Sequence, residues 1–261
     1  MTKIFFFDID NTLLDHQTNS IPESALSAIN DLKANGHKVA IATGRSHAHA
    51  KTYLMQLQPS YAVMQNGAII LRGDEVMGKS PLAHDALMAL FVEMTARGHS
   101  YGINGEAGGH VSAETEQVML PMDSVAIKVN ADFDFYKASE VLQGWLFFDE
   151  SLDAELIPEL HAMFPQFDYV RWHQTAVDVL PKGVNKLTGC QSVLKDLGMD
   201  AEQAYAFGDG LNDMEMLQGL GTGIAMGNAH PRLKEVADRV ADSIQHDGLA
   251  KMVRQIQSEL A

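Results

Sequence analysis

The first eighty residues alternate between short apolar runs and helical segments. Apolar side chains dominate residues 4–7, 38–42 and 61–64, as expected for strands buried on both faces of a parallel sheet. Between the first two runs, apolar residues repeat at helical spacing over residues 22–34. The helix boundary signals are Pro22 as a first helical residue, Asn35-Gly36 as a stop, and Ser46 as the cap of a second helix that runs to Leu57. The order strand–helix–strand–helix–strand predicts a parallel α/β sheet.

The pattern changes after a predicted hairpin at residues 68–71 and 75–77, and the change lasts to about residue 181. Ser80-Pro81 predicts the start of a helix that reaches Arg97. Strands are then predicted at 99–103, 109–112, 125–130, 145–148, 167–170 and 176–180, with helices at 133–142 and 153–163. Hairpin-like strands with a few helices indicate a separate α+β domain over residues 81–180.

The α/β alternation returns after that segment. A helix is predicted at 184–197, a buried strand at 203–207, a helix to about 217, a strand at 223–226, a short helix and strand to 240, and a last helix at 246–260. The predicted fold class is therefore α/β, with a Rossmann-like parallel sheet core built from residues 1–80 and 181–261. Residues 81–180 would form an α+β domain inserted into that core.

Two carboxylates, Asp8 and Asp10, come directly after the first buried strand. A strand that is buried does not normally end in two acids, because an unpaired buried charge is costly. Oxygen ligands held there favour a hard cation such as Mg²⁺. An ordinary strand followed by an acidic turn remains the alternative for this stretch taken alone.

Three further polar clusters stand after predicted strands or at a helix start: Thr43-Gly44-Arg45, the segment from Lys182 to Lys186, and the segment from Asp209 to Asp213. The carboxyl ends of parallel strands lie at one edge of a sheet, so these distant segments are expected to converge with Asp8. Carboxylates, a lysine and a hydroxyl suit phosphoryl transfer, in which a metal neutralises charge and a carboxylate attacks.

The overall charge limits the classes of partner. The chain has 19 Lys and Arg against 34 Asp and Glu, a net charge of −15. This balance disfavours nucleic acid and anionic membranes, although a local metal can still attract a small anionic substrate. The single cysteine, Cys190, permits no intrachain disulfide, and neither a signal peptide nor a membrane span is predicted. We therefore expect a cytoplasmic protein, while no feature of the sequence indicates an oligomeric state.

The ordered motifs resemble those of the haloacid dehalogenase (HAD) superfamily. Residues 7–14, Phe-Asp-Ile-Asp-Asn-Thr-Leu-Leu, are similar to its first motif. Its second, third and fourth motifs resemble Ala42-Thr-Gly-Arg45, Gly183-Val-Asn-Lys186 and Gly208-Asp-Gly-Leu-Asn-Asp213, respectively. Asn66-Gly67-Ala68, residues 225–229 and Asp247-Gly248 resemble the Cof-type phosphatase subfamily. Each motif alone is weak, whereas four in order along the whole chain are specific.

This resemblance implies roles for individual residues. Asp8 would be the nucleophile that forms an aspartyl-phosphate, and Asp10 the general acid and base, with its backbone carbonyl on the metal. Thr43 and Lys186 would hold the phosphoryl group. Asp8 and Asp209 would bind Mg²⁺, and Asp213 would support Lys186 or the metal waters from behind. The remaining substrate-binding candidates are Gly44, Arg45 and Asn212.

Three points in this assignment are open or atypical. Lys182 competes with Lys186 for the third motif, and Lys186 is preferred because it falls on the first turn of the predicted helix. For Arg45 a structural ion pair is an equally consistent interpretation. Leu187 stands where many relatives have Gly, which would narrow the site without removing a catalytic group.

The resemblance implies a Mg²⁺-dependent phosphomonoester hydrolase that acts on a small phosphorylated metabolite, such as a sugar phosphate. Residues 81–180 would then be the cap that selects the substrate. Two other functions are kept as alternatives, a phosphomutase on the same catalytic plan and a receiver-like signalling phosphoacceptor. Asp10 and the insertion disfavour the phosphoacceptor, because a receiver needs neither a leaving-group acid nor a cap.

Overall fold

The computed structural model describes residues 1–105, 108–131 and 140–260. The chain forms two compact units. Unit 1 comprises Met1–Gly44, Lys51–Met77 and Asn185–Ala261, and unit 2 comprises Arg45–Ala50 and Gly78–Val184. No helix in the described ranges is both long and apolar enough to cross a bilayer.

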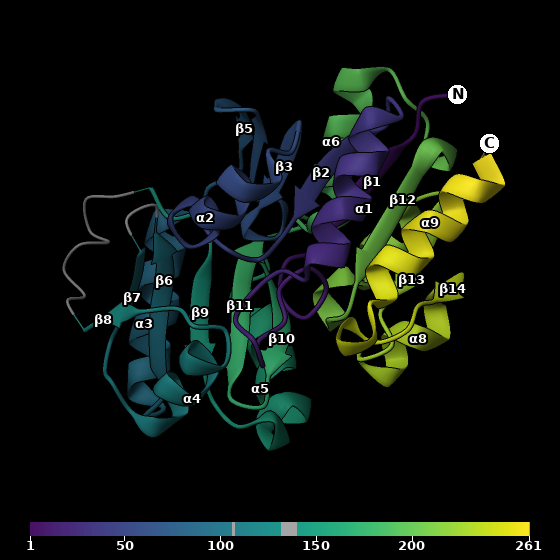
Figure 1. Ribbon diagram of the computed structural model, residues 1–261. Coiled ribbons are helices and arrows are strands. Elements are labelled where there is room, and N and C mark those ends of the chain that lie inside the picture. The colour runs from purple at the N-terminus through teal and green to yellow at the C-terminus, as the bar shows by residue number, and fades with distance from the viewer. Residues whose placement is uncertain (106–107, 132–139, 261) are drawn as a thin grey trace. The chain divides into compact units, whose positions relative to one another are not determined.

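Unit 1 is built on an eight-stranded sheet in which β1 lies between β12 and β2 (Figure 1). In spatial order the strands are β14 (Arg239–Val240), β13 (Thr222–Ala225), β12 (Ala204–Gly208), β1 (Ile4–Phe7), β2 (Lys38–Ala42), β3 (Tyr61–Met64), β4 (Ile69–Arg72) and β5 (Glu75–Lys79). Neighbours from β14 to β3 are parallel, and β4 returns antiparallel to β3. The predicted parallel α/β sheet is therefore confirmed.

The apolar run of β1 explains its inner position. All four of its side chains are fully buried. Two of them pack against aromatic rings of β12, with ring centroids 4.8 Å apart for Phe5 and Tyr205 and 5.0 Å apart for Phe7 and Phe207. Phe7 is in register with Phe207 on one side and Ile41 on the other. The next residues of all three strands consequently reach the same sheet edge.

Helices cover this sheet. They are α1 (Glu23–Ala34), the part of α2 (His47–Leu57) from Lys51 on, α6 (Lys186–Leu197), α7 (Met214–Gly219), α8 (Pro231–Val236) and α9 (Gly248–Leu260). Helices α1 and α9, from opposite ends of the chain, lie side by side (Figure 1). Helix α1 starts one residue after Pro22, which is its N-cap rather than its first helical residue.

Helix α6 begins two residues later than predicted. The Asn185 side chain accepts the backbone N–H of Thr188, and the Thr188 hydroxyl accepts the backbone N–H of Asn185. This reciprocal capping box fixes Asn185 as the cap and makes Lys186 the first helical residue. The helix ends at Gly198, whose φ of 62° is favourable for glycine.

Unit 2 contains a six-stranded sheet. In spatial order its strands are β10 (Phe167–His173), β11 (Ala176–Pro181), β9 (Gly144–Phe147), β6 (Ser100–Gly105), β7 (Gly108–Val111) and β8 (Val129–Asn130). Neighbours are antiparallel except for the parallel pair β7 and β8. Alternate residues of β9 enter two cores, because successive strand side chains point to opposite faces. Leu146 packs in one core, and Trp145 and Phe147 pack in the other.

Different helices contribute side chains to the two cores of unit 2. Helices α3 (His84–Ala96) and α5 (Asp153–Met163) contribute to the core of Leu146. Helix α4 (Glu116–Ser124) contributes Val118 and Met122 to the core of Trp145. The sheet therefore carries helices on both faces, as an α+β arrangement with two hydrophobic layers.

Three predicted elements of this unit need correction or lie outside the described residues. The helix expected from Ser80-Pro81 begins only at His84, because Leu82 is buried and its N–H donates to the Val141 carbonyl at 2.8 Å. The strand expected at 125–130 is limited to β8, and the preceding helix α4 was missed because Pro121 interrupts its pattern. Most of the helix expected at 133–142 falls outside the described residues.

Candidate active site

Asp8 directly follows β1, and its side chain contacts Lys186, the first residue of α6. Its side chain is nearly buried, and its backbone N–H donates to the Phe207 carbonyl at 3.0 Å, which extends the strand pairing. The Lys186 Nζ donates to Asp8 Oδ1 at 2.7 Å and to Asp213 Oδ1 at 2.6 Å. Lys186 is only 1% exposed. One ammonium group therefore joins two carboxylates from opposite ends of the sequence.

Asp213 closes the loop that follows β12. It lies on a short 3-10 turn, η5 (Leu211–Asp213), and its Oδ2 accepts the backbone N–H groups of Asp209 and Gly210, each at 3.0 Å. A Cβ at Gly208 would lie 2.5 Å from this carboxylate, so glycine is needed for the close approach. Both Asp213 oxygens are thus occupied, one by Lys186 and one by the loop.

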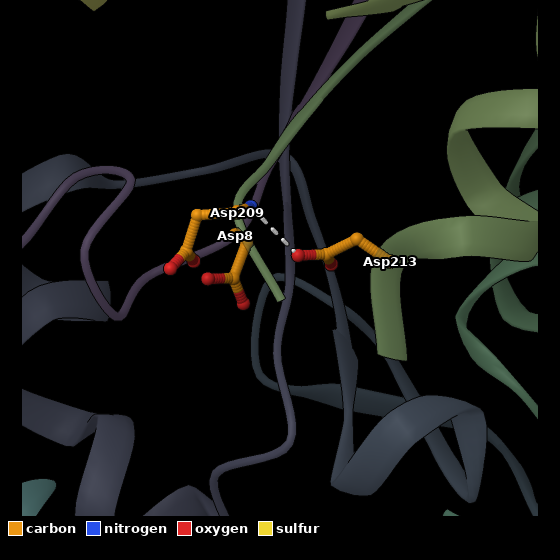
Figure 2. A group of neighbouring side chains, drawn as sticks. All are labelled: Asp8, Asp209 and Asp213. Atoms are coloured by element: carbon orange, nitrogen blue, oxygen red, sulfur yellow. Dashed lines mark hydrogen bonds between the residues drawn. The ribbon is translucent and has the colours of Figure 1, made fainter. Parts of the chain in front are cut away.

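Asp209 completes a group of three carboxylates. Ligand oxygens of Asp8, Asp209 and Asp213 lie within 4.8 Å of one another. Figure 2 shows the carboxylates of Asp8 and Asp209 pointing to the same side, with Asp213 approaching from the segment that follows β12. The dashed line is the hydrogen bond from the Asp209 backbone to Asp213.

The three carboxylates of this group would be stabilised by a cation. Burial raises the pKa of Asp8 to about 7, with the Lys186 charge opposing the rise and the Asp213 and Asp10 charges adding to it. Burial, followed by the charges of Asp8 and Asp213, raises the pKa of Asp209 well above its ordinary value. Burial opposes the charge of Lys186, but Asp213 and Asp8 raise its pKa overall. Three carboxylates around one ammonium leave excess negative charge, and their oxygen donors fit Mg²⁺.

Thr43 and Gly44 lie in the loop after β2. Thr43 is fully buried; its N–H donates to Val63 at 2.9 Å, and its carbonyl accepts the Asn66 N–H at 3.0 Å. A Cβ on Gly44 would come within 3.3 Å of the Asn66 side chain. Asn66 Oδ1 in turn accepts a hydrogen bond from Asn212 Nδ2 at 3.0 Å. Asn66 therefore links the loops after β2, β3 and β12, a contact that its Asn-Gly motif did not reveal.

The lysine that contacts Asp8 is Lys186. Lys182 belongs to unit 2, has a side chain that is 62% exposed, and forms an ion pair with Asp168 at 2.7 Å. Arg45 also belongs to unit 2. Its guanidinium donates hydrogen bonds to the backbone carbonyls of His49 at 3.3 Å and of Val125 at 2.8 Å.

Asp10 stands outside the three-carboxylate group. Its Oδ1 lies 2.8 Å from the Nε2 of His16, a residue that no sequence motif singled out. The six-residue separation matches no catalytic motif, so only the loop conformation shows this pair.

Comparisons with known proteins identify the family of the chain. Residues 5–253 match the profile of the haloacid dehalogenase-like hydrolases. The chain is 37% identical over 257 residues to the Bacillus subtilis (strain 168) protein named "Putative phosphatase YkrA", covering 98% of both chains.

Two solved structures share the whole fold. One is the HAD subclass IIB sugar phosphatase BT4131, with a TM-score of 0.87 and 30% identity over 98% of this chain and 99% of the other. The second is the HAD phosphatase BT1666 from Bacteroides thetaiotaomicron, with a TM-score of 0.88 and 26% identity over 98% and 96% of the two chains. The chain thus belongs to the haloacid dehalogenase-like hydrolase family and is an enzyme of its phosphatase type.

Proposed function

We propose that the protein is a Mg²⁺-dependent phosphomonoester hydrolase that works through an aspartyl-phosphate on Asp8. The observation that carries this proposal is the position of Asp8 at the end of β1, held by Lys186 and next to Asp209. A buried carboxylate with one oxygen fixed by an ammonium group is oriented for attack from its other oxygen. The single positive charge of Lys186 does not neutralise the three carboxylates near it, so a bound metal cation would bring the site closer to neutrality.

Asp8, Asp209 and the backbone carbonyl of Asp10 are the groups that would hold Mg²⁺. When bound, the metal would neutralise the charge of the phosphoryl group and of the carboxylates around it. Asp213 would support the site without binding the metal, because its two oxygens already accept hydrogen bonds from Lys186 and from the loop after Gly208. This arrangement supports the assignment of Asp213 as a supporting residue rather than a ligand.

The chain's own residues can account for both halves of the reaction. Asp8 attacks phosphorus, the bond from phosphorus to the leaving oxygen breaks, and Asp10 gives that oxygen a proton. Asp10 then removes a proton from water, which attacks phosphorus and releases Asp8 and inorganic phosphate. Lys186 and Thr43 hold the transferred phosphoryl group during both steps. Gly44, Arg45 and Asn212 are proposed to contact the phosphate or the substrate.

The substrate is proposed to be a small phosphorylated metabolite in the cytoplasm, with a sugar phosphate first among the candidates. The similarity to a protein named as a sugar phosphatase supports that choice. We further propose that residues 1–80 and 181–261 form the catalytic core and that residues 81–180 form the cap that selects the substrate. Exchange of residues 81–180 for those of a relative should then change the ranking of substrates.

The function is tested by measuring phosphate release from a panel of phosphorylated metabolites with Mg²⁺ and with EDTA. We expect release from at least one ester with Mg²⁺, reversible loss in EDTA, and no turnover by Asp8→Asn or Asp209→Asn. The matched control is Asp31→Asn, which removes an exposed carboxylate of α1 and should keep full activity. Hydrolysis that persists in EDTA would contradict the metal role, and transfer to a second substrate without phosphate release would indicate a mutase.

A further inference from the structure

The loop that follows the catalytic strand, residues 11–20, is held in one conformation by its own hydrogen bonds. The Asn11 N–H donates to the Leu14 carbonyl at 2.9 Å, and Asp15 and Ser20 exchange backbone hydrogen bonds of 3.0 and 3.3 Å. The buried Asp15 also accepts the Gln17 N–H at 2.9 Å through Oδ1. His16 therefore projects from a turn that is fixed on both sides.

This turn brings His16 back to Asp10. The Nε2 of His16 lies 2.8 Å from Asp10 Oδ1, and the two side chains are only 20% and 22% exposed. This hydrogen bond fixes the Asp10 carboxyl group against the His16 ring through one of its two oxygens, Oδ1. The two acids of the motif thus have different hydrogen-bond partners, Lys186 for Asp8 and His16 for Asp10.

We propose that His16 is a positioning residue for Asp10. Because Oδ1 is engaged by His16, we assign the proton transfers of Asp10 to its other oxygen, Oδ2. As the bond between phosphorus and the leaving oxygen breaks, Oδ2 gives its proton to that oxygen; in the second step Oδ2 takes one back from the attacking water. His16 neither gains nor loses a proton. This inference rests on the proposed function and concerns a residue that the proposed function does not use.

A positioning role predicts a loss that depends on the leaving group, since an activated leaving group needs little protonation. The probes are para-nitrophenyl phosphate, less activated aryl phosphates, and an alkyl phosphate that the wild type hydrolyses. For His16→Leu we expect kcat/KM on the alkyl phosphate to fall by about 10- to 100-fold, which is less than the ~10²–10⁴-fold that general acid–base catalysis contributes in full. On para-nitrophenyl phosphate the same variant should lose less than about threefold, because little of that contribution is then needed.

Two polar variants make the test independent of any folding defect in His16→Leu. His16→Gln can place an amide N–H near the position of Nε2 and should restore most of the alkyl phosphatase activity. His16→Asn is too short to reach Asp10 and should behave like His16→Leu. Gln17→Ala alters an exposed neighbour in the same loop and should leave the dependence on the leaving group unchanged.

The outcomes separate this inference from the proposed function. Equal losses on all esters, no loss, or failure of Gln to restore activity would overturn the positioning role while leaving the hydrolase intact. If the wild type released phosphate from no ester in Mg²⁺, both ideas would fall together.

Discussion

At the scale of single residues, the decisive feature is one ammonium group shared by two buried carboxylates. Lys186 contacts Asp8 and Asp213 at 2.7 and 2.6 Å, and all three are at most 5% exposed. Such ion pairs add little net stability, because the cost of desolvating the charges offsets their attraction. Removing one partner is different, since the charges that remain are buried and unpaired.

We therefore predict that Lys186→Met abolishes turnover and lowers the free energy of unfolding by about 3–5 kcal/mol. Lys182→Met is the matched control, because Lys182 is exposed and its pair with Asp168 is worth at most about 1 kcal/mol. Urea unfolding of both variants measures the difference. If the two variants lost equal stability, the buried triad would not have the energetic role assigned to it.

Asp10 gives a second prediction at this scale. Asn at position 10 keeps the size of the side chain and the backbone carbonyl but cannot transfer a proton. We expect Asp10→Asn to fold, and to lose about 10²–10⁴-fold in turnover of alkyl phosphates. With an activated aryl phosphate, Asp8 should still be phosphorylated and the phosphoenzyme should accumulate. Rapid quench followed by intact-mass measurement detects that phosphoryl group, and unchanged alkyl phosphatase activity would refute the acid–base role.

At the scale of elements, the site depends on how α6 is placed against the loop after β3. That loop contains a 3-10 turn, η1 (Gln65–Gly67), and Gly67 has a φ of 99°. A Cβ at Gly67 would lie 2.2 Å from the carbonyl oxygen of Asn185, the cap of α6. The first turn of α6, which carries Lys186, can therefore approach the sheet only where residue 67 has no side chain.

Gly67→Ala tests this dependence. We expect it to lower the free energy of unfolding by about 2–5 kcal/mol, the sum of backbone strain and overpacking, and to reduce activity by displacing Lys186. Gly73→Ala is the control, because Gly73 also has a positive φ, 56°, but a Cβ added there would meet no atom of the described residues within 4 Å. Its cost should be about 1–2 kcal/mol from strain alone. Thermal or urea unfolding compares the two, and equal costs would mean that the contact with α6 is unimportant.

At the scale of the whole molecule, charge makes the stability of the fold depend on pH. The chain carries a net charge of −15, and its buried carboxylate group adds a local excess. The pKa of Asp8 is about 7 in the folded protein, above its ordinary value of 3.8. Asp8 therefore contributes stability that is fully present below about pH 4 and is lost as the pH rises through about 7.

The proposed Mg²⁺ would bind the ionised carboxylates and should therefore offset this loss most strongly at alkaline pH. We predict that saturating Mg²⁺ raises Tm more at pH 8 than at pH 5.5. At 100 times Kd the gain at pH 8 would be about 2.7 kcal/mol, which corresponds to roughly 5–10 °C. Scanning calorimetry at the two pH values measures it, and Asp209→Asn should lose most of the shift. A shift that is the same at both pH values would contradict the proposed ligand set.

The sequence by itself determined the elements of unit 1 and the edge at which its polar residues meet. Apolar runs such as Ile4–Phe7 specify buried strands, because burial on both faces requires an unbroken run of apolar side chains. The position of Asp8, Thr43 and Asp209 just after such strands then follows from parallel pairing. Local patterns carry this information because each depends on residues that are near one another in the chain.

Only the tertiary structure decided which side chains contact one another. It brought Lys186, the lysine that the sequence already favoured over Lys182, into contact with Asp8, joined Asn66 to Asn212, and turned His16 toward Asp10. These contacts depend on strand register, helix caps and loop hydrogen bonds, and two of the three join residues more than a hundred positions apart. The missed helix α4 has the same cause: Pro121 disfavours a helix locally, but Val118 and Met122 pack into a core formed by distant strands.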